Sequence, residues 1–266
     1  MRDEDALREQ ICAIGRALFE RGHIAPTDGN VSARLDARYV LCTPSGKHKG
    51  QLRPGDIVKV LVSEGRPVRL GQRASSEFKM HLAIYAARPD VHAIVHAHSP
   101  STVGLSVAGF SLEKPVVPEA ILALGSIPTV PYASPTTADV PEAVASYLRH
   151  ANAFVLERHG PVALGETVAQ AYERLEIIEH TAKITIAALI AGGAHPLGDA
   201  EAAKLRAMAA AAGLTPGGPG PAPAPLRAPS APRVASYPPT ATVLSSPDEQ
   251  LVAEIAARVL SRLSRP

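Results

Sequence analysis

Apolar residues recur along this chain with two periods, and segments of the two kinds alternate. A helical spacing of apolar side chains runs through residues 4–21, and Gly22 follows where a helix would end. Strand-like apolar runs come next, in NVSARL, YVLC and DIVKVLV. The stretch SSEFKMHLAIYAARP then favours a helix that is capped by its serines and stopped by Pro89.

The alternation continues into the second half of the chain. VHAIVHAH and AFVLERHG are apolar, strand-like runs, and each contains a histidine close to its end. A long helix is expected over ETVAQAYERLEIIEHTAKITIAALIAGG, which closes on two glycines. Strands and helices that alternate in this way predict an α/β sandwich.

The composition of the chain changes near residue 214. Residues 214–244 are rich in Pro, Ala and Gly and contain few residues that could form a core. Such a segment cannot bury enough apolar surface to offset its loss of conformational entropy, and its prolines make it semi-extended. We therefore expect a domain over residues 1–213, followed by a linker.

Residues 245–266 favour a separate amphipathic helix after this linker. Ser246 and Glu249 form a capping box around Pro247, which suits the first helical position. One apolar stripe follows, formed by Leu251, Val252, Ile255, Val259, Leu260 and Leu263. Since a short terminal helix has nothing of its own to bury this stripe against, we expect it to dock on another surface.

Composition narrows the classes of function. Hydrophobic residues make up 46% of the 266 residues, and a net charge of +2 without a dense basic run argues against nucleic-acid binding. No apolar run approaches the length of a membrane span, and the charged start MRDEDALREQ does not resemble a signal peptide. Cys12 and Cys42 have no metal-motif spacing, which suggests a reducing compartment. These features predict a cytoplasmic protein.

Three histidines and one carboxylate form the candidate metal site. His96 and His98 lie two positions apart in a strand-like run, so both rings should point to one face. His159 ends a later run, and Glu77 lies at the start of the serine-capped helix. Each residue alone has an ordinary structural explanation, as a core histidine, a turn histidine or a carboxylate at a helix start. Together they suit a catalytic zinc ion, which takes three protein nitrogens and keeps an exchangeable position.

Small polar turns suggest that the substrate carries a phosphate. They are TDGNVS, TPSG and SSE, and their glycines permit close approach of the backbone to a ligand. Ser75 and Ser76 would open a helix, whose free N–H groups favour an anion. The candidate phosphate-binding residues in these turns are Thr27, Gly29, Asn30, Ser45, Gly46, Ser75 and Ser76.

The segments GNVSARL, TPSG, SSEFKMHLAIYAARPDVHAIVHAHSPST and LERHG resemble the class II aldolase/adducin family, and within it the bacterial L-fuculose-1-phosphate aldolases. The similarity runs over residues 5–205 or so. It implies a three-layer α/β/α sandwich, a homotetramer with sites between subunits, and one zinc ion per subunit. His96, His98 and His159 match the family's zinc ligands, and Glu77 matches the carboxylate that ligates the resting ion and then acts as acid and base.

The activity implied by this resemblance is that of a lyase. The expected reaction is zinc-dependent cleavage of L-fuculose 1-phosphate or L-rhamnulose 1-phosphate to dihydroxyacetone phosphate and L-lactaldehyde. Glu119 stands where the aldolases carry a tyrosine, so we expect it either to assist proton transfer at the aldehyde end or only to cap a helix. A sugar-phosphate 4-epimerase, a dehydratase or a decarboxylase remains possible on this scaffold, as does a non-catalytic adducin-like module, against which the retained metal ligands argue.

The C-terminal segment has a resemblance of its own. A Pro/Ala-rich linker followed by DEQLVAEIAARVLSRL is similar to the encapsulation peptides of bacterial microcompartment cargo. The resemblance implies docking of residues 245–266 on shell proteins and a location inside a microcompartment. The alternative is a helix that packs on its own oligomer or self-associates.

Overall fold

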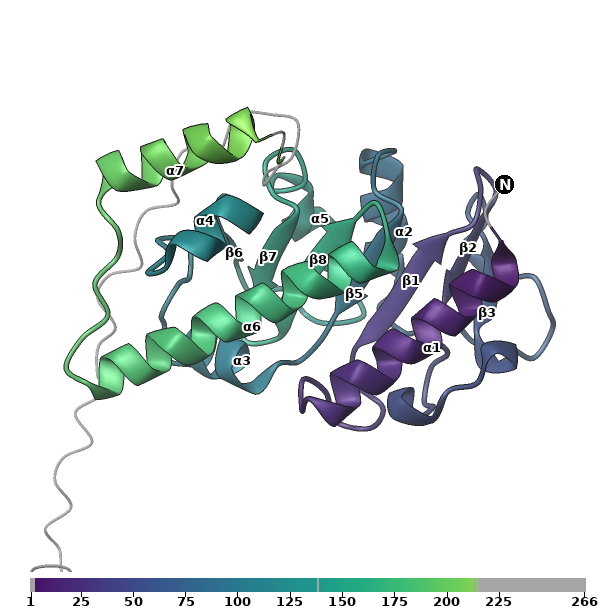
Figure 1. Cartoon of the computed structure of the whole chain (residues 1–266). Coiled ribbons are helices and arrows are strands. Elements are labelled where there is room, and N and C mark those ends of the chain that lie inside the picture. Colours follow the sequence, from purple (N-terminus) through teal and green to yellow (C-terminus); the bar gives the residue numbers. More distant parts are fainter. Residues whose placement is uncertain (1–2, 138, 213, 215–266) are drawn as a thin grey trace, which may run out of the picture. The chain divides into compact units, whose positions relative to one another are not determined.

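The structure, a computed structural model, describes residues 3–137, 139–212 and 214. The elements in chain order are α1 (Glu4–Glu20), β1 (Asn30–Arg34), β2 (Tyr39–Cys42), η1 (Lys49–Gln51), η2 (Pro54–Asp56), β3 (Val58–Leu61), β4 (Arg66–Pro67), α2 (Phe78–Ala87), β5 (Ala93–His96), α3 (Pro100–Val107), α4 (Pro118–Leu124), β6 (Thr129–Val130), α5 (Asp139–Ala145), β7 (Ala153–Leu156), β8 (Gly160–Gly165), α6 (Val168–Ile190) and α7 (Asp199–Ala211) (Figure 1). The linker at 214–244, apart from Leu214, and the helix expected at 245–266 lie outside the described residues.

The strands form one mixed sheet in the order β4-β3-β2-β1-β5-β8-β7-β6. Neighbouring strands run antiparallel, except β6 and β7, which are parallel. In the middle of the sheet, β5 lies between β1 and β8, and its last residue, His96, pairs with Asn30 on one side and Val162 on the other. This register places His96 at the centre of the sheet.

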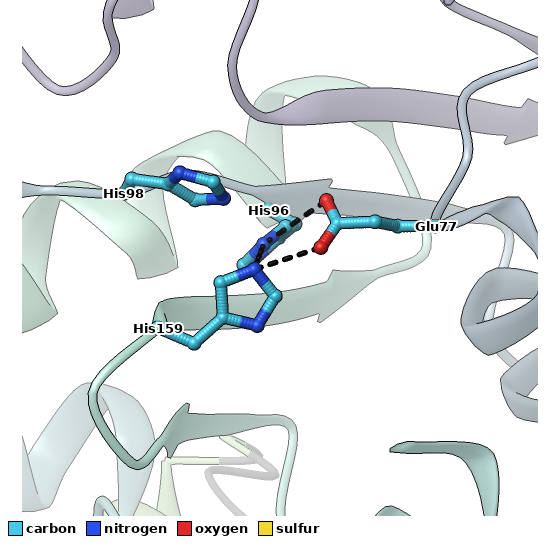
Figure 2. A group of neighbouring side chains, drawn as sticks. All are labelled: Glu77, His96, His98 and His159. Atoms are coloured by element: carbon cyan, nitrogen blue, oxygen red, sulfur yellow. Dashed lines mark hydrogen bonds and ion pairs between the residues drawn. The ribbon is translucent and has the colours of Figure 1, made fainter. Parts of the chain in front are cut away.

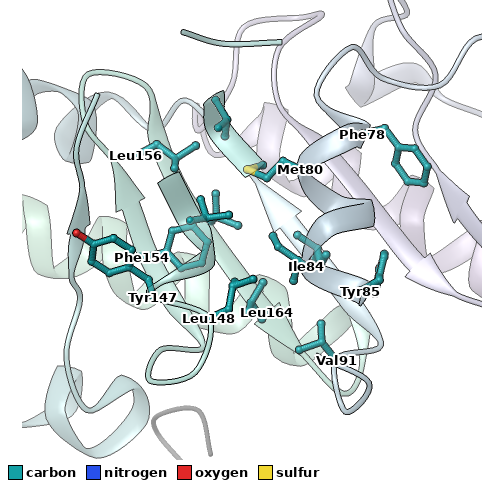
Figure 3. Close-up of a cluster of buried hydrophobic side chains, with 14 of the residues drawn as sticks. Phe78, Met80, Ile84, Tyr85, Val91, Tyr147, Leu148, Phe154, Leu156 and Leu164 are labelled. Atoms are coloured by element: carbon teal, nitrogen blue, oxygen red, sulfur yellow. The ribbon is translucent and has the colours of Figure 1, made fainter. Parts of the chain in front are cut away.

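Helices cover both faces of the sheet, which confirms the predicted α/β/α sandwich. Successive residues of one strand point to opposite faces: Val95 belongs to the cluster under α1 and α6, and Ile94 to the cluster under α2 and α5. Figure 3 shows the second cluster, where Met80 and Ile84 of α2 lie beside Phe154. The strands β5, β7 and β8 are therefore buried on both sides, and the core is mostly aliphatic.

The longest helices agree with the apolar pattern of the sequence. In α1, Asp3 caps the N-terminus by accepting bonds from the N–H groups of Asp5 and Ala6, and Leu7, Ile11 and Leu18 are buried. Gly22 follows with a φ of 73°, as expected for a residue just beyond a helix end. α6 likewise ends shortly before the two glycines. None of the described helices is long and apolar enough to cross a membrane.

Two local expectations are corrected. The helix at SSEFKMHL is not capped by its serines, because the residue at the N-cap position is Glu77 and α2 begins at Phe78. The strand that carries the first histidines ends at His96, so His98 lies beyond it. Both differences fall at residues of the candidate metal site, Glu77 and His98.

Candidate metal centre

His96 is held rigidly at the end of β5. Its side chain is fully buried, and its Nδ1 lies 2.9 Å from the carbonyl oxygen of Pro161. Because a carbonyl only accepts, Nδ1 carries the proton and Nε2 presents a lone pair to the group formed with Glu77 and His159.

His159 comes from the turn between β7 and β8, where a glycine brings two loops together. Its Nε2 lies 2.7 Å from Oε1 of Glu77 and 3.4 Å from Nε2 of His96 (Figure 2). A Cβ atom on Gly160 would lie 2.1 Å from the carbonyl oxygen of Ala97, so only glycine allows this turn to reach the segment that follows β5. Gly160, directly after His159, thus allows His159 to approach the site.

Glu77 enters the site from the opposite side, at the N-terminus of α2. Its Oε2 accepts a bond of 2.7 Å from Nδ2 of Asn30, the residue paired with His96, and lies 3.5 Å from Nε2 of His96. Since Glu77 occupies the N-cap position without capping the helix, its carboxylate is free to face the histidines.

His98 completes the group although it lies outside the strand. The bend after β5 keeps its ring on the same side as that of His96, with 5.1 Å between ring centroids, and 4.8 Å separates it from the ring of His159. Its Nδ1 lies 3.6 Å from Oδ2 of Asp28, while its Nε2 is buried and has no hydrogen-bond partner among the described residues.

The four side chains fit a metal ion. Each offers one ligand atom, and these atoms lie within 4.8 Å of one another. Burial lowers the pKa of His96 to about 3 and also lowers that of His98, so both imidazoles are neutral near pH 7. For Glu77, burial opposes ionisation, but its interactions with His96 and His159, the hydrogen bond with His159 among them, outweigh burial and the pKa is lowered. Three imidazole nitrogens and one carboxylate are a donor set that suits zinc and related divalent ions.

The residues predicted to bind phosphate come from three segments that the structure brings together. The N–H of Val31 donates to Oγ1 of Thr43, which joins the first segment to the second. The second segment is joined to the third by bonds from Ser45 N to Arg73 O and from Ser75 N to Thr43 O, of 3.0 and 3.2 Å. Thr27, Gly29 and Asn30 precede or begin β1, Ser45 and Gly46 follow β2, and Ser75 and Ser76 precede Glu77.

Glu119 takes no part in the group of four. It lies exposed in the first turn of α4, and no described contact joins it to Glu77 or the histidines. Two residues near the site were not expected from the sequence: Asp28, which approaches His98, and Lys49, whose buried ammonium donates to the carbonyl of Thr27. Both occur in loops rich in polar residues, where a single sequence gives no sign of which side chains turn inward.

Comparison with known proteins identifies the family. Residues 9–186 match the model of the class II aldolase and adducin N-terminal domain. The chain belongs to the class II aldolase and adducin family. Among curated members, the 3-oxo-tetronate 4-phosphate decarboxylase of Cupriavidus necator is 36% identical over 188 residues, which are 69% of this chain and 85% of the relative. The L-fuculose phosphate aldolase of Methanococcus vannielii is 34% identical over 176 residues, or 66% of this chain and 93% of the relative.

A solved structure of a class II aldolase family member also matches this fold. YgbL from Escherichia coli, which is described as an aldolase, epimerase or decarboxylase, superposes with a TM-score of 0.70 at 32% identity. The match covers 76% of this chain and 99% of YgbL. The similar enzymes are decarboxylases and aldolases, and this chain is a lyase with a candidate group of metal ligands, Glu77, His96, His98 and His159.

Proposed function

We propose that this protein is a metal-dependent lyase that decarboxylates 3-oxo-tetronate 4-phosphate, or a close analogue, to dihydroxyacetone phosphate and CO₂. The observation that carries the proposal is the composition of the group, three imidazoles and a single carboxylate within 4.8 Å. The substrate class is taken from the decarboxylases to which the chain is similar.

Decarboxylation of a 3-oxo acid requires one proton-transfer group. When the bond between C1 and C2 of a 3-oxo acid breaks, CO₂ leaves and the electron pair stays on C2, shared with the oxygen on C3. A divalent metal ion supplies a Lewis acid that stabilises such negative charge on oxygen. Glu77 then carries a proton from solvent to C2, which gives dihydroxyacetone phosphate. His96, His98 and His159 would hold the ion, and Asn30 would orient Glu77 through its bond to Oε2.

The turns around β1, β2 and α2 would hold the phosphate. Their residues are small or carry hydroxyl or amide groups, and the segments are joined by backbone hydrogen bonds, so their N–H and hydroxyl groups would need little rearrangement on binding. This arrangement supports a phosphorylated substrate of a few carbons, anchored at one end by the turns and at the other by the metal ion.

Retro-aldol cleavage of L-fuculose 1-phosphate or L-rhamnulose 1-phosphate is the second candidate. It leaves the same dihydroxyacetone phosphate enediolate, but it also needs a group that exchanges the proton of the aldehyde oxygen. Glu119 is the sequence candidate for that group, and it lies exposed on α4 rather than beside Glu77. The aldolase function therefore needs Glu119, or an equivalent group, to come from another subunit, whereas decarboxylation needs only Glu77.

An assay of two substrates, in which dihydroxyacetone phosphate and CO₂ are both measured, distinguishes the two candidate functions. Purified protein loaded with Zn²⁺ is given synthetic 3-oxo-tetronate 4-phosphate or L-fuculose 1-phosphate, and dihydroxyacetone phosphate and CO₂ are recorded together. We expect both products from the first substrate, loss of activity with a chelator and recovery on adding Zn²⁺. Dihydroxyacetone phosphate from L-fuculose 1-phosphate alone would replace the proposal with the aldolase function.

Two variants assign the proton-transfer groups. Glu77→Gln keeps the size of the side chain but cannot carry the proton, and we expect a loss of about 100-fold or more in turnover. Glu119→Gln is the matched control, since it makes the same change on α4. Decarboxylation at the wild-type rate in Glu119→Gln supports a single proton-transfer group, and a large loss there would contradict it.

Three finer features are part of this proposal. Zinc is the proposed ion, because nitrogen-rich sites with one carboxylate suit it. A homotetramer is the proposed assembly, and residues 245–266 are proposed to dock on microcompartment shell proteins. The last two rest on the family resemblance and on the sequence of the tail.

A further inference from the structure

The turn before β1 packs directly against the segment that carries His98. A Cβ atom on Gly29, whose φ is 63°, would lie 2.7 Å from the carbonyl oxygen of His96 and 3.4 Å from Cα of Ala97. The turn therefore approaches the end of β5 as closely as a backbone can, and the residue before Gly29 is Asp28. Asp28 is thus presented to His98 by the backbone itself.

The carboxylate of Asp28 faces one nitrogen of the His98 ring. Oδ2 of Asp28 lies 3.6 Å from Nδ1 of His98, within the distance of a charged or polar contact and slightly longer than a hydrogen bond. Nε2, on the other side of the ring, is buried without a hydrogen-bond partner among the described residues and belongs to the candidate metal group. An imidazole that donates from Nδ1 to a carboxylate presents the lone pair of Nε2.

A buried lysine fixes the turn in this position. Nζ of Lys49 donates to the carbonyl oxygens of Thr27 and Lys47, at 2.8 and 3.0 Å, and the N–H of Lys49 donates to the carbonyl of Pro26 at 2.7 Å. The side chain of Lys49 is buried. Two of these bonds are accepted by consecutive residues of the turn, Pro26 and Thr27, and they limit its motion, so Asp28 does not depend on its own surface contacts for its place.

We propose that Asp28 is a positioning residue for the metal site, which holds the His98 ring so that Nε2 faces the ion. This inference rests on the proposed metal site and goes beyond it, because Asp28 is not a ligand. A partly exposed contact of this kind contributes little to folding stability. Asp28 contributes to metal affinity instead. A carboxylate next to the non-ligating nitrogen of a histidine ligand fixes the tautomer and the orientation of the ring.

Metal affinity tests the proposal without any enzyme assay. The full chain and its variants compete with a chromophoric chelator for Zn²⁺, and the dissociation constant is read from the absorbance. Asp28→Ala removes the carboxylate, and we expect Zn²⁺ to bind about 10- to 100-fold more weakly. Asp28→Asn keeps an oxygen that can accept from Nδ1, so it should recover part of the loss. Asp5→Asn, an exposed position on α1, is the control for the loss of one negative charge.

The outcomes separate this inference from the proposed function. An Asp28→Ala protein that binds Zn²⁺ within about twofold of the wild type overturns the role of Asp28 and leaves the metal site standing. An equal loss in Asp5→Asn would overturn it too, since the effect would then be one of net charge. A wild-type protein that binds no Zn²⁺ would overturn both the site and the inference.

Discussion

Single residues at the candidate site are constrained by what surrounds them. Glu77 receives a hydrogen bond from Asn30 and faces two imidazoles, so its carboxylate has one orientation available. Gly160 is constrained in a different way, because the space for a side chain is already filled by the backbone of Ala97. Substitution at such positions changes the shape of the site as well as its chemistry.

Gly160→Ala tests the steric constraint. The new Cβ would lie 2.1 Å from the carbonyl oxygen of Ala97, at a φ of 150° that L-residues rarely adopt, so either β8 or the segment after β5 must shift. We expect the free energy of unfolding to fall by about 2–4 kcal/mol, measured by urea denaturation. Gly104→Ala is the control, because it lies in α3 with no atom near the added methyl group, and it should be neutral or stabilising.

At the scale of elements, α2 joins the candidate site to the core. Its N-terminus carries Glu77, and one turn further on His81 is buried, with its Nδ1 2.7 Å from Oγ of Ser32 on β1. Burial lowers the pKa of His81 to about 4, against a weaker opposing attraction from Glu77. His81 is therefore neutral in the folded protein at pH values where an unfolded chain would protonate it.

The difference in the pKa of His81 between the folded and the unfolded chain predicts that acid lowers the free energy of unfolding. Between pH 6.5 and 4 the unfolded chain binds the proton on residue 81 and the folded chain does not, so the free energy of unfolding falls as the pH falls. The full contribution is up to about 3 kcal/mol, present above pH 6.5 and lost towards pH 4. In His81→Gln, denaturant unfolding at pH 7 and pH 4.5 should show a smaller loss than in the wild type. Equal losses would contradict this assignment.

How much of the fold could be predicted depends on the length of each element. The helices α1 and α6 were predicted closely, because a long apolar stripe and a terminal glycine are local signals. The two-residue strands β4 and β6 have no such signal, since each is formed by pairing with a neighbour. The serines before α2 were assigned the capping role, whereas the N-cap residue is Glu77 and Ser75 lies two residues before it, where its hydroxyl accepts from the N–H of Glu77.

The candidate metal ligands could be predicted from the sequence, but the reason that joined them was partly wrong. His96 and His98 were placed together because alternate strand residues share a face, whereas the strand ends at His96 and a bend keeps the second ring on that side. Asp28 and Lys49 were missed because their contacts depend on how two loops fold onto each other. Whether Glu119 acts in catalysis remains a prediction.

On the scale of the whole molecule, the chain combines a domain of the class II aldolase and adducin family with a tail of different composition. The family match ends at residue 186, before the Pro-rich segment begins, so we expect the tail to be an addition to the domain. We expect its role to be one of location or assembly.

Deleting residues 245–266 tests that role. The truncated protein should keep the decarboxylase rate and the Zn²⁺ affinity of the full chain, because every candidate site residue lies between 27 and 159. It should no longer co-purify with microcompartment shell proteins. Unchanged co-purification would remove the proposed docking role, and a change in oligomeric state would assign the tail to assembly of the protein itself.

The ligands of the candidate metal site lie far apart in the sequence, from Glu77 to His159. A bound ion therefore closes a long loop through the middle of the domain, and an unfolded chain, in which these residues are scattered, would hold the ion poorly. Binding that favours the folded state raises stability with every increase in free metal concentration. The supply of the ion would then govern the lifetime of the protein in the cell as well as its catalytic rate. A shortage of metal would lower the amount of folded enzyme in addition to its activity.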